Sequence, residues 1–290
     1  MNTCLLTGAT GLIGTEFLGL MESRGWMVHA LSRRKPSLDS DAVRFIECDL
    51  SREWPVSRLP AKVDAVVHLA QSKNFRRFPE FSQDIFDVNT AITVRSLHYA
   101  RQSGAGTFVL ASSGGIYGHG MEGFKEDEPV FPSSDLGFYL STKLCAEVLA
   151  ESFTPYLNVI ILRFFFVYGP GQRSSMLVPR LMARIRDGEP VTLHGRDGIK
   201  INPIFVSDAA RAVSSSLDLE TSHKINIGGP EILTMRTIGE QIGALVGREP
   251  NFEIEQDVPP KDLIGDISKM CRVFREPEVR FSEGIAKMAE

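Results

Sequence analysis

Short apolar, β-rich runs alternate with segments of helical period through the first 165 residues, and this alternation restricts the possible fold more than any other feature. Some of the runs, such as Val159–Leu162, are apolar on both faces, as is typical of parallel strands covered by helices on both sides. We therefore predict an α/β fold with a doubly wound parallel sheet of the Rossmann type. The predicted strands are Thr3–Thr7, Met27–Leu31, Val43–Ile46, Val63–Leu69, Thr107–Ala111 and Leu157–Leu162.

The later part of the chain is less regular, because Gly and Pro crowd together after Tyr168. We expect a dinucleotide-binding domain over residues 1–165, with residues 201–229 packing back onto it. Residues 166–200 and 230–290 would form a smaller C-terminal substrate-binding lobe. The predicted helices are Leu12–Ser23, Ile85–Arg101, Ser141–Ser152, Met176–Arg186, Ser207–Leu217 and Met235–Leu245.

Composition narrows the class of partner. The chain has 290 residues, 43% of them hydrophobic and 23% charged, with a formal net charge of -4, so it is expected to fold and to bind a small molecule rather than nucleic acid. No apolar stretch reaches the roughly 20 residues that span a bilayer, and no basic leader is visible, which favours the cytoplasm. Four scattered cysteines and six unclustered histidines indicate neither a disulfide framework nor a metal site.

A glycine-rich turn follows the first predicted strand. The run Gly8-Ala9-Thr10-Gly11-Leu12-Ile13-Gly14 lies between this strand and a predicted helix. Glycines there allow a sharp turn and a close approach of backbone to a pyrophosphate, which also meets the positive end of the helix dipole. The turn therefore predicts a dinucleotide site formed by Gly8, Thr10, Gly11, Leu12, Ile13 and Gly14.

The end of the second strand bears on the choice of dinucleotide. NAD-selective sites usually carry Asp or Glu there, whereas this chain has Ser32, Arg33 and Arg34. A hydroxyl and guanidinium groups can bind a 2′-phosphate, so NADP(H) is favoured over NAD(H). The alternative is a solvated basic turn without a ligand.

Two further segments carry candidate chemistry. Tyr139 and Lys143 are spaced i, i+4, so they share one helix face, and the ammonium is expected to lower the pKa of the phenol toward the working range. Ser112–Gly118 follows the strand Thr107–Ala111, at the edge where doubly wound folds bind ligands. A serine hydroxyl there can hold a substrate oxygen beside Tyr139.

With these motifs in place, the chain resembles the extended short-chain dehydrogenase/reductase superfamily, and within it the NAD(P)-dependent nucleotide-sugar epimerase/dehydratase family. The resemblance covers nearly the whole chain in order. It is carried by Thr7–Gly14, Asp49-Leu50, His68–Ala70, Asn89, Ser112–Gly118, Tyr139-x-x-x-Lys143, Leu162–Pro170, Val206–Asp208, Asn226–Gly229 and Asp266–Lys269.

The resemblance implies roles for individual residues. Ser113, Tyr139 and Lys143 would form the catalytic triad, with Lys143 also holding the nicotinamide ribose. Asn89 would brace the active-site helix, and Phe165 is expected in the core. The other implied cofactor contacts are Asp49 and Leu50 at the adenine, Leu69 and Ala70 in the pocket, Lys73 at a phosphate, and Phe164 to Val167 near the nicotinamide.

The chain also departs from the family pattern. Gly114 and Gly115 stand where the family's dehydratases carry an acidic residue, so no acid is evident for water elimination and dehydration is disfavoured. The resemblance would lead one to expect a cysteine beside Ser113 in epimerase-reductases that act at C3 and C5. This chain has none there.

Substrate recognition departs in a second way. The family usually has Asn where this chain has Phe166, and an Arg where it has Ile201-Asn202-Pro203; both usually address the nucleotide diphosphate. Arg173, Arg180 or Lys261 would have to supply the missing charge, unless these side chains are simply solvated surface.

The leading hypothesis is an NAD(P)-dependent enzyme that transfers hydride at a secondary alcohol or ketone, at C4 of a nucleotide sugar, as a 4-epimerase or a 4-ketoreductase. The alternatives are a non-catalytic NADP-binding sensor and a reductase of a carbonyl substrate without a nucleotide. A homodimer is expected, paired through the helices Ile85–Arg101 and Ser141–Ser152, with Val94, Leu97, Leu144 and Val148 as interface candidates or as internal core.

Overall fold

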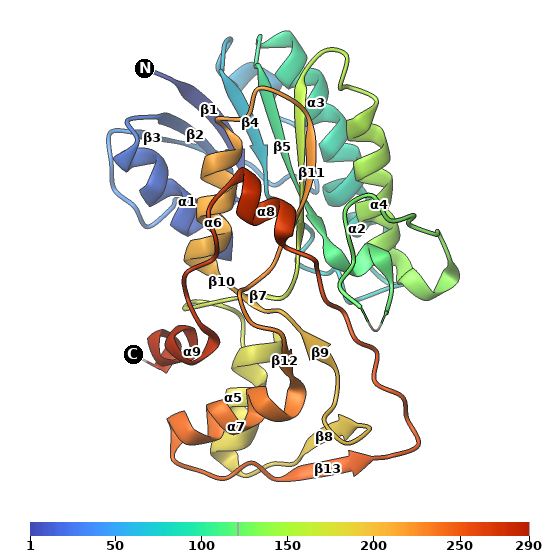
Figure 1. Cartoon of the computed structure of the whole chain (residues 1–290). Helices are drawn as coiled ribbons and strands as arrows, with labels where there is room; N and C mark the ends of the chain where they lie inside the picture. Colours follow the sequence, from blue (N-terminus) through green and yellow to red (C-terminus); the bar gives the residue numbers. More distant parts are fainter. Residues whose placement is uncertain (121, 290) are drawn as a thin grey trace. The chain divides into compact units, whose positions relative to one another are not determined.

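The computed structural model describes residues 1–120 and 122–289. Its central element is a seven-stranded sheet in the order β11-β6-β5-β4-β1-β2-β3, with helices on its faces (Figure 1). The neighbouring pairs β1–β2, β1–β4, β2–β3 and β4–β5 are parallel, which confirms the predicted doubly wound α/β class. The strands are β1 Thr3–Thr7, β2 Met27–Ser32, β3 Val43–Glu47, β4 Ala65–His68, β5 Thr107–Ser113, β6 Asn158–Phe164 and β11 His223–Ile227.

The chain divides into two compact units. Unit 1 contains residues 1–116, 129–163 and 210–225, and unit 2 contains residues 117–128, 164–209 and 226–290. The domain boundaries expected from the sequence stay a prediction. The helices of unit 1 are α1 Leu12–Ser23, α2 Ser82–Phe86, α3 Ile92–Gln102 and α4 Gly137–Glu151, and α6 Val206–Ser216 begins in unit 2 and ends in unit 1.

The core of unit 1 forms where sheet residues meet helices. Leu5, Val66 and Phe108 come from three adjacent strands and are completely buried against Leu97 of α3 and Ala146 of α4. Of the two roles that the sequence left open for Leu97, an interface residue or internal core, the structure therefore shows internal core. Apolar positions on both faces of these strands explain why they need helices on both sides.

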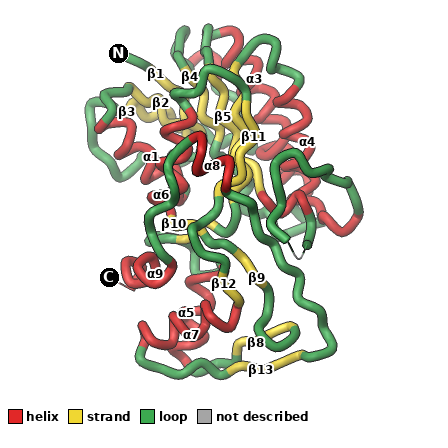
Figure 2. The backbone as a smooth tube through the Cα atoms, in the orientation of Figure 1, coloured by secondary structure: helices red, strands yellow, loops and turns green. Residues whose placement is uncertain are grey.

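Unit 2 is built from short strands and amphipathic helices, and Figure 2 shows α5 and α7 side by side. Its own aromatic core includes Phe165, Tyr168, Phe205 and Phe281, all at most 4% exposed, so the expectation of a core Phe165 is met. The remaining elements are β7 Val167–Tyr168, α5 Leu177–Asp187, β8 Val191–His194, β9 Lys200–Ile201, β10 Ile204–Phe205, β12 Leu233–Thr234, α7 Met235–Val246, β13 Phe252–Glu255, α8 Ser268–Val273 and α9 Phe281–Ala289.

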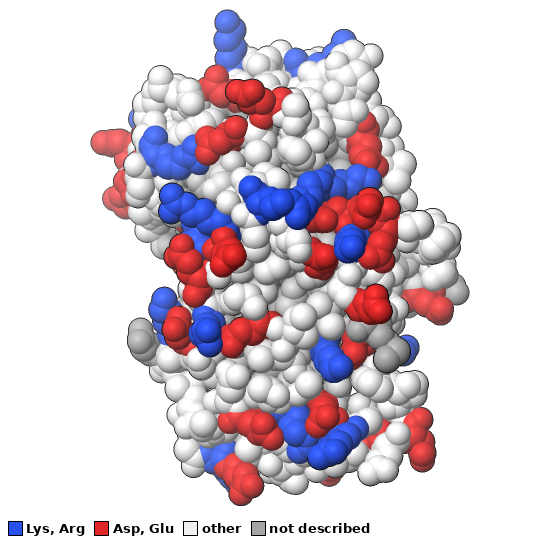
Figure 3. Space-filling model, viewed as in Figure 1, with Lys and Arg blue, Asp and Glu red and all other residues white. Residues whose placement is uncertain are grey.

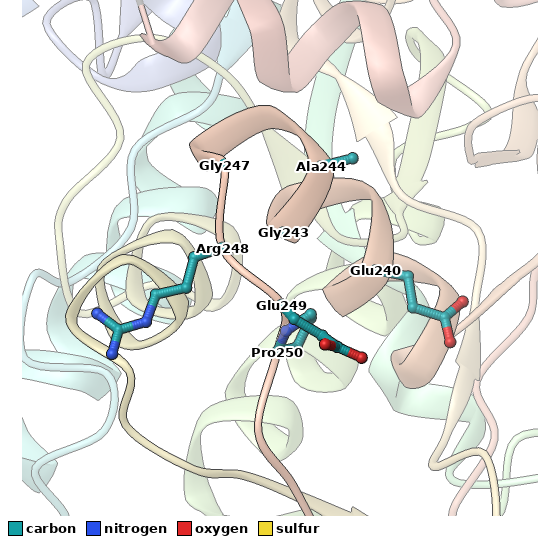
Figure 4. Close-up of a pocket in the computed structure, with 7 residues that line it drawn as sticks. All are labelled: Glu240, Gly243, Ala244, Gly247, Arg248, Glu249 and Pro250. Carbon is teal, nitrogen blue, oxygen red and sulfur yellow. The ribbon is translucent and has the colours of Figure 1, made fainter.

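A surface cavity of about 390 Å³ lies at the C-terminal end of α7, with Glu240, Arg248 and Glu249 among its lining residues (Figure 4). It contains no residue of the predicted site. On the face drawn in Figure 3, basic and acidic side chains are interspersed rather than gathered into areas of one sign. Within residues 1–120 and 122–289, no helix has the length and apolar character needed to span a membrane.

Candidate active site

The glycine turn after β1 is packed too closely for side chains. Gly8 has a φ of +77°, and a Cβ there would lie 2.8 Å from the Ala70 nitrogen at the end of β4. A Cβ on Gly14 would lie 2.2 Å from the Gly8 carbonyl oxygen, so the first turn of α1 rests directly on the turn. These contacts explain two of the three glycines physically.

This turn fits the pyrophosphate of a dinucleotide. Gly11 is the N-cap of α1, in extended conformation, and no side chain among residues 1–120 and 122–289 caps the helix. Its first backbone N–H groups are therefore available to an anion, with the positive end of the helix dipole behind them. Thr10 and Gly11 are exposed at this point, and Leu12 and Ile13 are half-buried.

A small buried network fixes the adjoining ends of β1 and β4. The Thr7 hydroxyl lies 2.7 Å from His68 Nδ1 and accepts a hydrogen bond of 3.3 Å from the Ala70 nitrogen. Burial, assisted by the charge of Lys143, lowers the pKa of His68 to about 3, so this imidazole is neutral. The network holds Ala70 against the glycine turn.

The polar end of β2 carries the three residues predicted to select the dinucleotide. Ser32 is buried and donates to the Arg34 carbonyl at 2.7 Å, while Arg33 and Arg34 are exposed. Burial raises the pKa of Asp49, but hydrogen bonds from Ser51 and the charges of Arg33 and Arg52 outweigh it, so the pKa lies below its ordinary value. Arg33 is thus electrostatically coupled to the predicted adenine-site carboxylate.

Ser113 is the last residue of β5, two residues further than the predicted strand end. Its hydroxyl accepts a hydrogen bond from the Gly115 nitrogen at 3.2 Å. A Cβ on Gly115 would lie 2.9 Å from Leu140 Cδ2 and 3.4 Å from Ser113 Oγ. The first turn of α4 therefore packs against the end of β5, beside the serine.

Tyr139 and Lys143 both lie in α4, which begins at Gly137 rather than at the expected Ser141. Lys143 is buried, and its ammonium donates to the Ala111 carbonyl of β5 at 2.9 Å. The Tyr139 hydroxyl donates to Gln71 Oε1 at 3.0 Å, in the loop after β4. Residues from β4, β5 and α4 thus meet at the carboxyl edge of the sheet.

The electrostatics of the pair differ from the expectation. Burial raises the pKa of Tyr139 above its ordinary value, although Arg76 lowers it in part, and the predicted lowering is wrong for this structure. The physical reason is that desolvation of the phenolate outweighs neighbouring charge. Burial also lowers the pKa of Lys143 to about 8, although Glu147 raises it in part.

Asn89 connects three elements of unit 1. It lies in a π-helical turn, Asp87–Ala91, between α2 and α3, and is 1% exposed. Its side-chain oxygen accepts from the Ser72 nitrogen at 2.9 Å, and its amide donates to the Thr142 hydroxyl at 3.0 Å. Because Thr142 precedes Lys143, these bonds hold the part of α4 that carries Lys143.

A buried ion pair fixes α4 to β6. Glu147 and Arg163 are 1% and 3% exposed, and Arg163 Nη2 lies 2.7 Å from a Glu147 carboxylate oxygen. A second bond of 3.1 Å runs from Arg163 Nε to the other oxygen, which makes the pair bidentate. Glu147 also faces Lys143, one turn earlier in the helix.

Sequence reasoning did not single out Gln71, Ser72, Asp84 or Thr142, which the structure places around Tyr139, Asn89 and Lys143. Gln71 and Ser72 had one sequence signal, their position shortly after the predicted strand Val63–Leu69. The predicted contacts Leu50, Leu69 and Lys73 also belong to unit 1.

The remaining predicted site residues belong to unit 2: Phe164, Phe166, Val167, Arg173, Arg180 and Lys261. Phe166 has a φ of +47°, a left-handed conformation that is rare for an aromatic residue. Arg173, Arg180 and Lys261 are exposed, and Lys261 contributes to a lowered pKa of His119, after burial. Within residues 1–120 and 122–289, no cluster of three potential metal ligands is found.

Asn202 explains one departure from the family pattern. It is 2% exposed, and its amide donates to the Gly265 carbonyl at 2.9 Å while its oxygen accepts from the Gly265 nitrogen at 3.0 Å. Where the family usually has an Arg that addresses a diphosphate, this chain therefore has a side chain that joins its own segment to the Gly265 backbone.

Comparison with known proteins finds a family and relatives that match most of this chain. A model of the NAD dependent epimerase/dehydratase family matches residues 4–228. The dTDP-4-dehydro-6-deoxy-D-allose reductase of Streptomyces bikiniensis is 29% identical, with 94% of this chain and 90% of the relative covered. The UDP-glucuronate 4-epimerase of Thermodesulfobacterium geofontis (strain OPF15) is 27% identical, with 99% and 95% covered.

Solved structures are similar over the same length. MoeE5 in complex with UDP-glucose and NAD has a TM-score of 0.84 at 29% identity, covering 99% of this chain and 97% of that one. The UDP-glucuronic acid 4-epimerase from Bacillus cereus, in complex with UDP-glucuronic acid and NAD, has a TM-score of 0.86 at 25% identity and the same coverage.

Proposed function

The chain belongs to the NAD-dependent epimerase/dehydratase family, and from this premise we propose that it transfers hydride at C4 of a nucleotide-linked sugar, as a 4-epimerase or a 4-ketoreductase. Similar proteins include a dTDP-sugar reductase and a UDP-glucuronate 4-epimerase. The observation that supports the proposal is that α4, which carries Tyr139 and Lys143, is hydrogen-bonded to Gln71 after β4 and to Ala111 of β5, the strand that ends at Ser113.

Each of the three side chains has a distinct task. Tyr139 exchanges a proton with the sugar oxygen, Ser113 orients that oxygen by hydrogen bonding, and Lys143 holds the nicotinamide ribose. When bound, the dinucleotide supplies the hydride acceptor and donor. The buried Lys143 is held at β5 by its bond to Ala111, so its ammonium is fixed before it meets the ribose.

Dehydration does not belong to the proposal. Gly114 and Gly115 follow Ser113, so no carboxyl group stands at the positions that would protonate a leaving hydroxyl. A side chain on Gly115 would also meet Leu140 at 2.9 Å. The chain therefore offers proton transfer at one oxygen, which suffices for epimerisation or for ketone reduction.

We favour NADP(H) over NAD(H) as the dinucleotide, although the similar solved structures contain NAD. Support comes from the exposed Arg33 and Arg34 at the end of β2, whose guanidinium groups can bind a 2′-phosphate. An acidic side chain at this position, as in NAD-selective sites, would repel that phosphate. The exposed Arg173, Arg180 and Lys261 of unit 2 are the candidates for the substrate diphosphate.

A homodimer through α3 and α4 is the proposed assembly. The two helices pack against each other, and their outer surface exposes apolar side chains: Val94 is 38%, Val148 57% and Leu149 38% exposed. Large exposed apolar side chains gathered on neighbouring helices are typical of a face that pairs.

The test is a turnover screen with purified protein. NADP+ and NAD+, and their reduced forms, are each supplied with UDP- and dTDP-linked hexoses, hexuronates and 4-keto sugars. Inversion at C4 without net cofactor change identifies a 4-epimerase, and stoichiometric oxidation of reduced cofactor identifies a 4-ketoreductase. Tyr139→Phe should reduce either activity at least 100-fold.

Two outcomes would contradict this proposal. A sensor would bind the dinucleotide tightly, show no turnover, and lose nothing in the Tyr139→Phe variant. A reductase of other carbonyl compounds would oxidise reduced cofactor with simple ketones and fail with every nucleotide sugar.

A further inference from the structure

Resting on the proposed function, we propose that Gln71 is a positioning residue for the proton transfer by Tyr139. Its side-chain oxygen accepts a hydrogen bond of 3.0 Å from the Tyr139 hydroxyl. Gln71 is not one of the three residues proposed above to be catalytic. Gln71 is exposed and lies one residue beyond Ala70, at the carboxyl end of β4.

The backbone next to Gln71 is held rigidly. Ser72 is 2% exposed, its nitrogen donates to Asn89 at 2.9 Å, and its hydroxyl donates to the Asp84 carboxylate. Asn74 donates from its backbone to the Ser72 hydroxyl at 3.0 Å and from its amide to Asp84 at 3.2 Å. A network of this kind fixes the loop, so the contact between Gln71 and Tyr139 does not depend on a freely moving segment.

The same loop also contacts the ring of Tyr139. The Phe75 and Tyr139 ring centroids are 4.9 Å apart with the planes tilted by 52°, and the Arg76 guanidinium lies 5.1 Å from the Phe75 ring centroid. One segment of five residues, Gln71 to Phe75, thus contacts both the hydroxyl and the ring of the acid-base residue.

The chemistry of the contact follows from what an amide oxygen can do. It accepts a hydrogen bond from the neutral phenol and stabilises that form over the phenolate. During ketone reduction the Tyr139 O–H bond breaks as its proton moves to the C4 oxygen, and water restores the proton afterwards. Gln71 gains and loses no proton; it holds the hydroxyl until the substrate oxygen replaces it.

Charged groups near the phenol also influence the pKa of Tyr139. Arg76 lowers the pKa of Tyr139 from the loop side, whereas burial raises it. On α4 itself, Lys143 follows one turn later, and Asp84 lies behind the loop, bound to Ser72 and Asn74. Substituting Gln71 leaves all of these groups in place.

The first test is the pH dependence of kcat/KM for the nucleotide sugar that is turned over. Gln71→Leu removes the acceptor and should lower the pKa assigned to Tyr139 by about half to one pH unit. Gln71→Glu places a negative charge there and should raise it. Gln102→Leu, at the exposed end of α3, is the matched control and should not move the profile.

A purely structural role would change the rate of both variants without moving the profile in opposite directions. Equal profiles for the two variants and the unsubstituted enzyme would overturn the proposal. If Tyr139→Phe abolishes turnover while the Gln71 variants keep the profile, the proposed function stands and this inference alone fails.

A second measurement needs no turnover. In protein labelled at tyrosine Cζ, Tyr139→Phe identifies one of the five tyrosine resonances. Gln71→Leu should shift that resonance, because the hydroxyl loses its acceptor, and Gln102→Leu should not. An unchanged Tyr139 resonance in Gln71→Leu would refute the contact even if no substrate is ever found.

Discussion

At the residue scale, burial sets the charge of individual groups around the candidate site. His68 is hydrogen-bonded to Thr7, and burial together with the charge of Lys143 lowers its pKa to about 3 from an ordinary value of 6.5. A neutral imidazole there adds no positive charge beside Lys143. The folded protein must therefore keep His68 unprotonated under conditions in which the unfolded chain protonates it.

This difference predicts an acid-labile contribution to stability. Between the two pKa values the unfolded chain binds the proton and the folded chain does not, so stability is lost as the pH falls below about 6.5. Urea unfolding should show that the unsubstituted protein loses about 1.4 kcal/mol more per pH unit than His68→Gln between pH 6 and pH 4. The exposed His98 offers a control: His98→Gln should follow the unsubstituted protein.

Arg33 and Arg34 carry the choice of dinucleotide. If they bind a 2′-phosphate, Arg33→Ala with Arg34→Ala should weaken NADP+ binding at least 30-fold, about 2 kcal/mol, because charge-assisted hydrogen bonds are lost. NAD+ binding should change less than threefold. Isothermal titration of both dinucleotides measures this. An equal loss for NADP+ and NAD+, or none for either, would indicate the solvated basic turn instead.

At the element scale, some boundaries could be predicted and others could not. The start of α1 at Leu12 followed from the glycines before an apolar helical pattern, and the structure agrees. The helix α4 begins at Gly137, four residues earlier than expected. The sequence did not predict this start because Gly137, Phe138 and Tyr139 have low helix propensity, and in the structure the 3₁₀ turn Ser134–Leu136 leads into them. The π-helical turn at Asn89 has no signature in a single sequence.

The helix α1 provides two glycines that should respond in opposite ways. In Gly14→Ala the new Cβ would lie 2.2 Å from the Gly8 carbonyl oxygen, which is backbone and cannot give way easily. We expect a loss of at least 2 kcal/mol in stability, as for other overpacked core sites, and at least tenfold weaker dinucleotide binding. In Gly19→Ala, in the same helix, the new Cβ has no neighbour within 4 Å in the described part of the chain and should stabilise the protein by up to about 1 kcal/mol. Thermal unfolding and dinucleotide titration of both variants test this, and a tolerated Gly14→Ala would contradict the packing argument.

At the scale of the whole molecule, pairing between distant segments was beyond sequence reasoning. Residues 117–128 belong to unit 2, where the Phe124 nitrogen donates to the Ile264 carbonyl at 2.8 Å and the Asp266 nitrogen donates to the Phe124 carbonyl at 2.8 Å. Local patterns carry no information on a contact between residues about 140 positions apart in sequence. The parallel sheet was predictable, because its strands repeat one pattern with helices between them.

Assembly of two chains is the last property that the exposed surface predicts. Val148 is 57% exposed on α4, next to the exposed Leu149 in sequence, and the neighbouring α3 exposes Val94. Val148→Asp would place a charge on the most exposed of these apolar side chains, where the partner could not pair it, so the proposed dimer should dissociate about 100-fold more readily. Sedimentation velocity over a concentration series measures the change. Val56→Asp is the matched control, because Val56 is 69% exposed in a different segment of unit 1 and should leave the dimer intact. A protein that is monomeric without substitution, or equal dissociation in both variants, would show that the apolar face of α3 and α4 does not pair with itself.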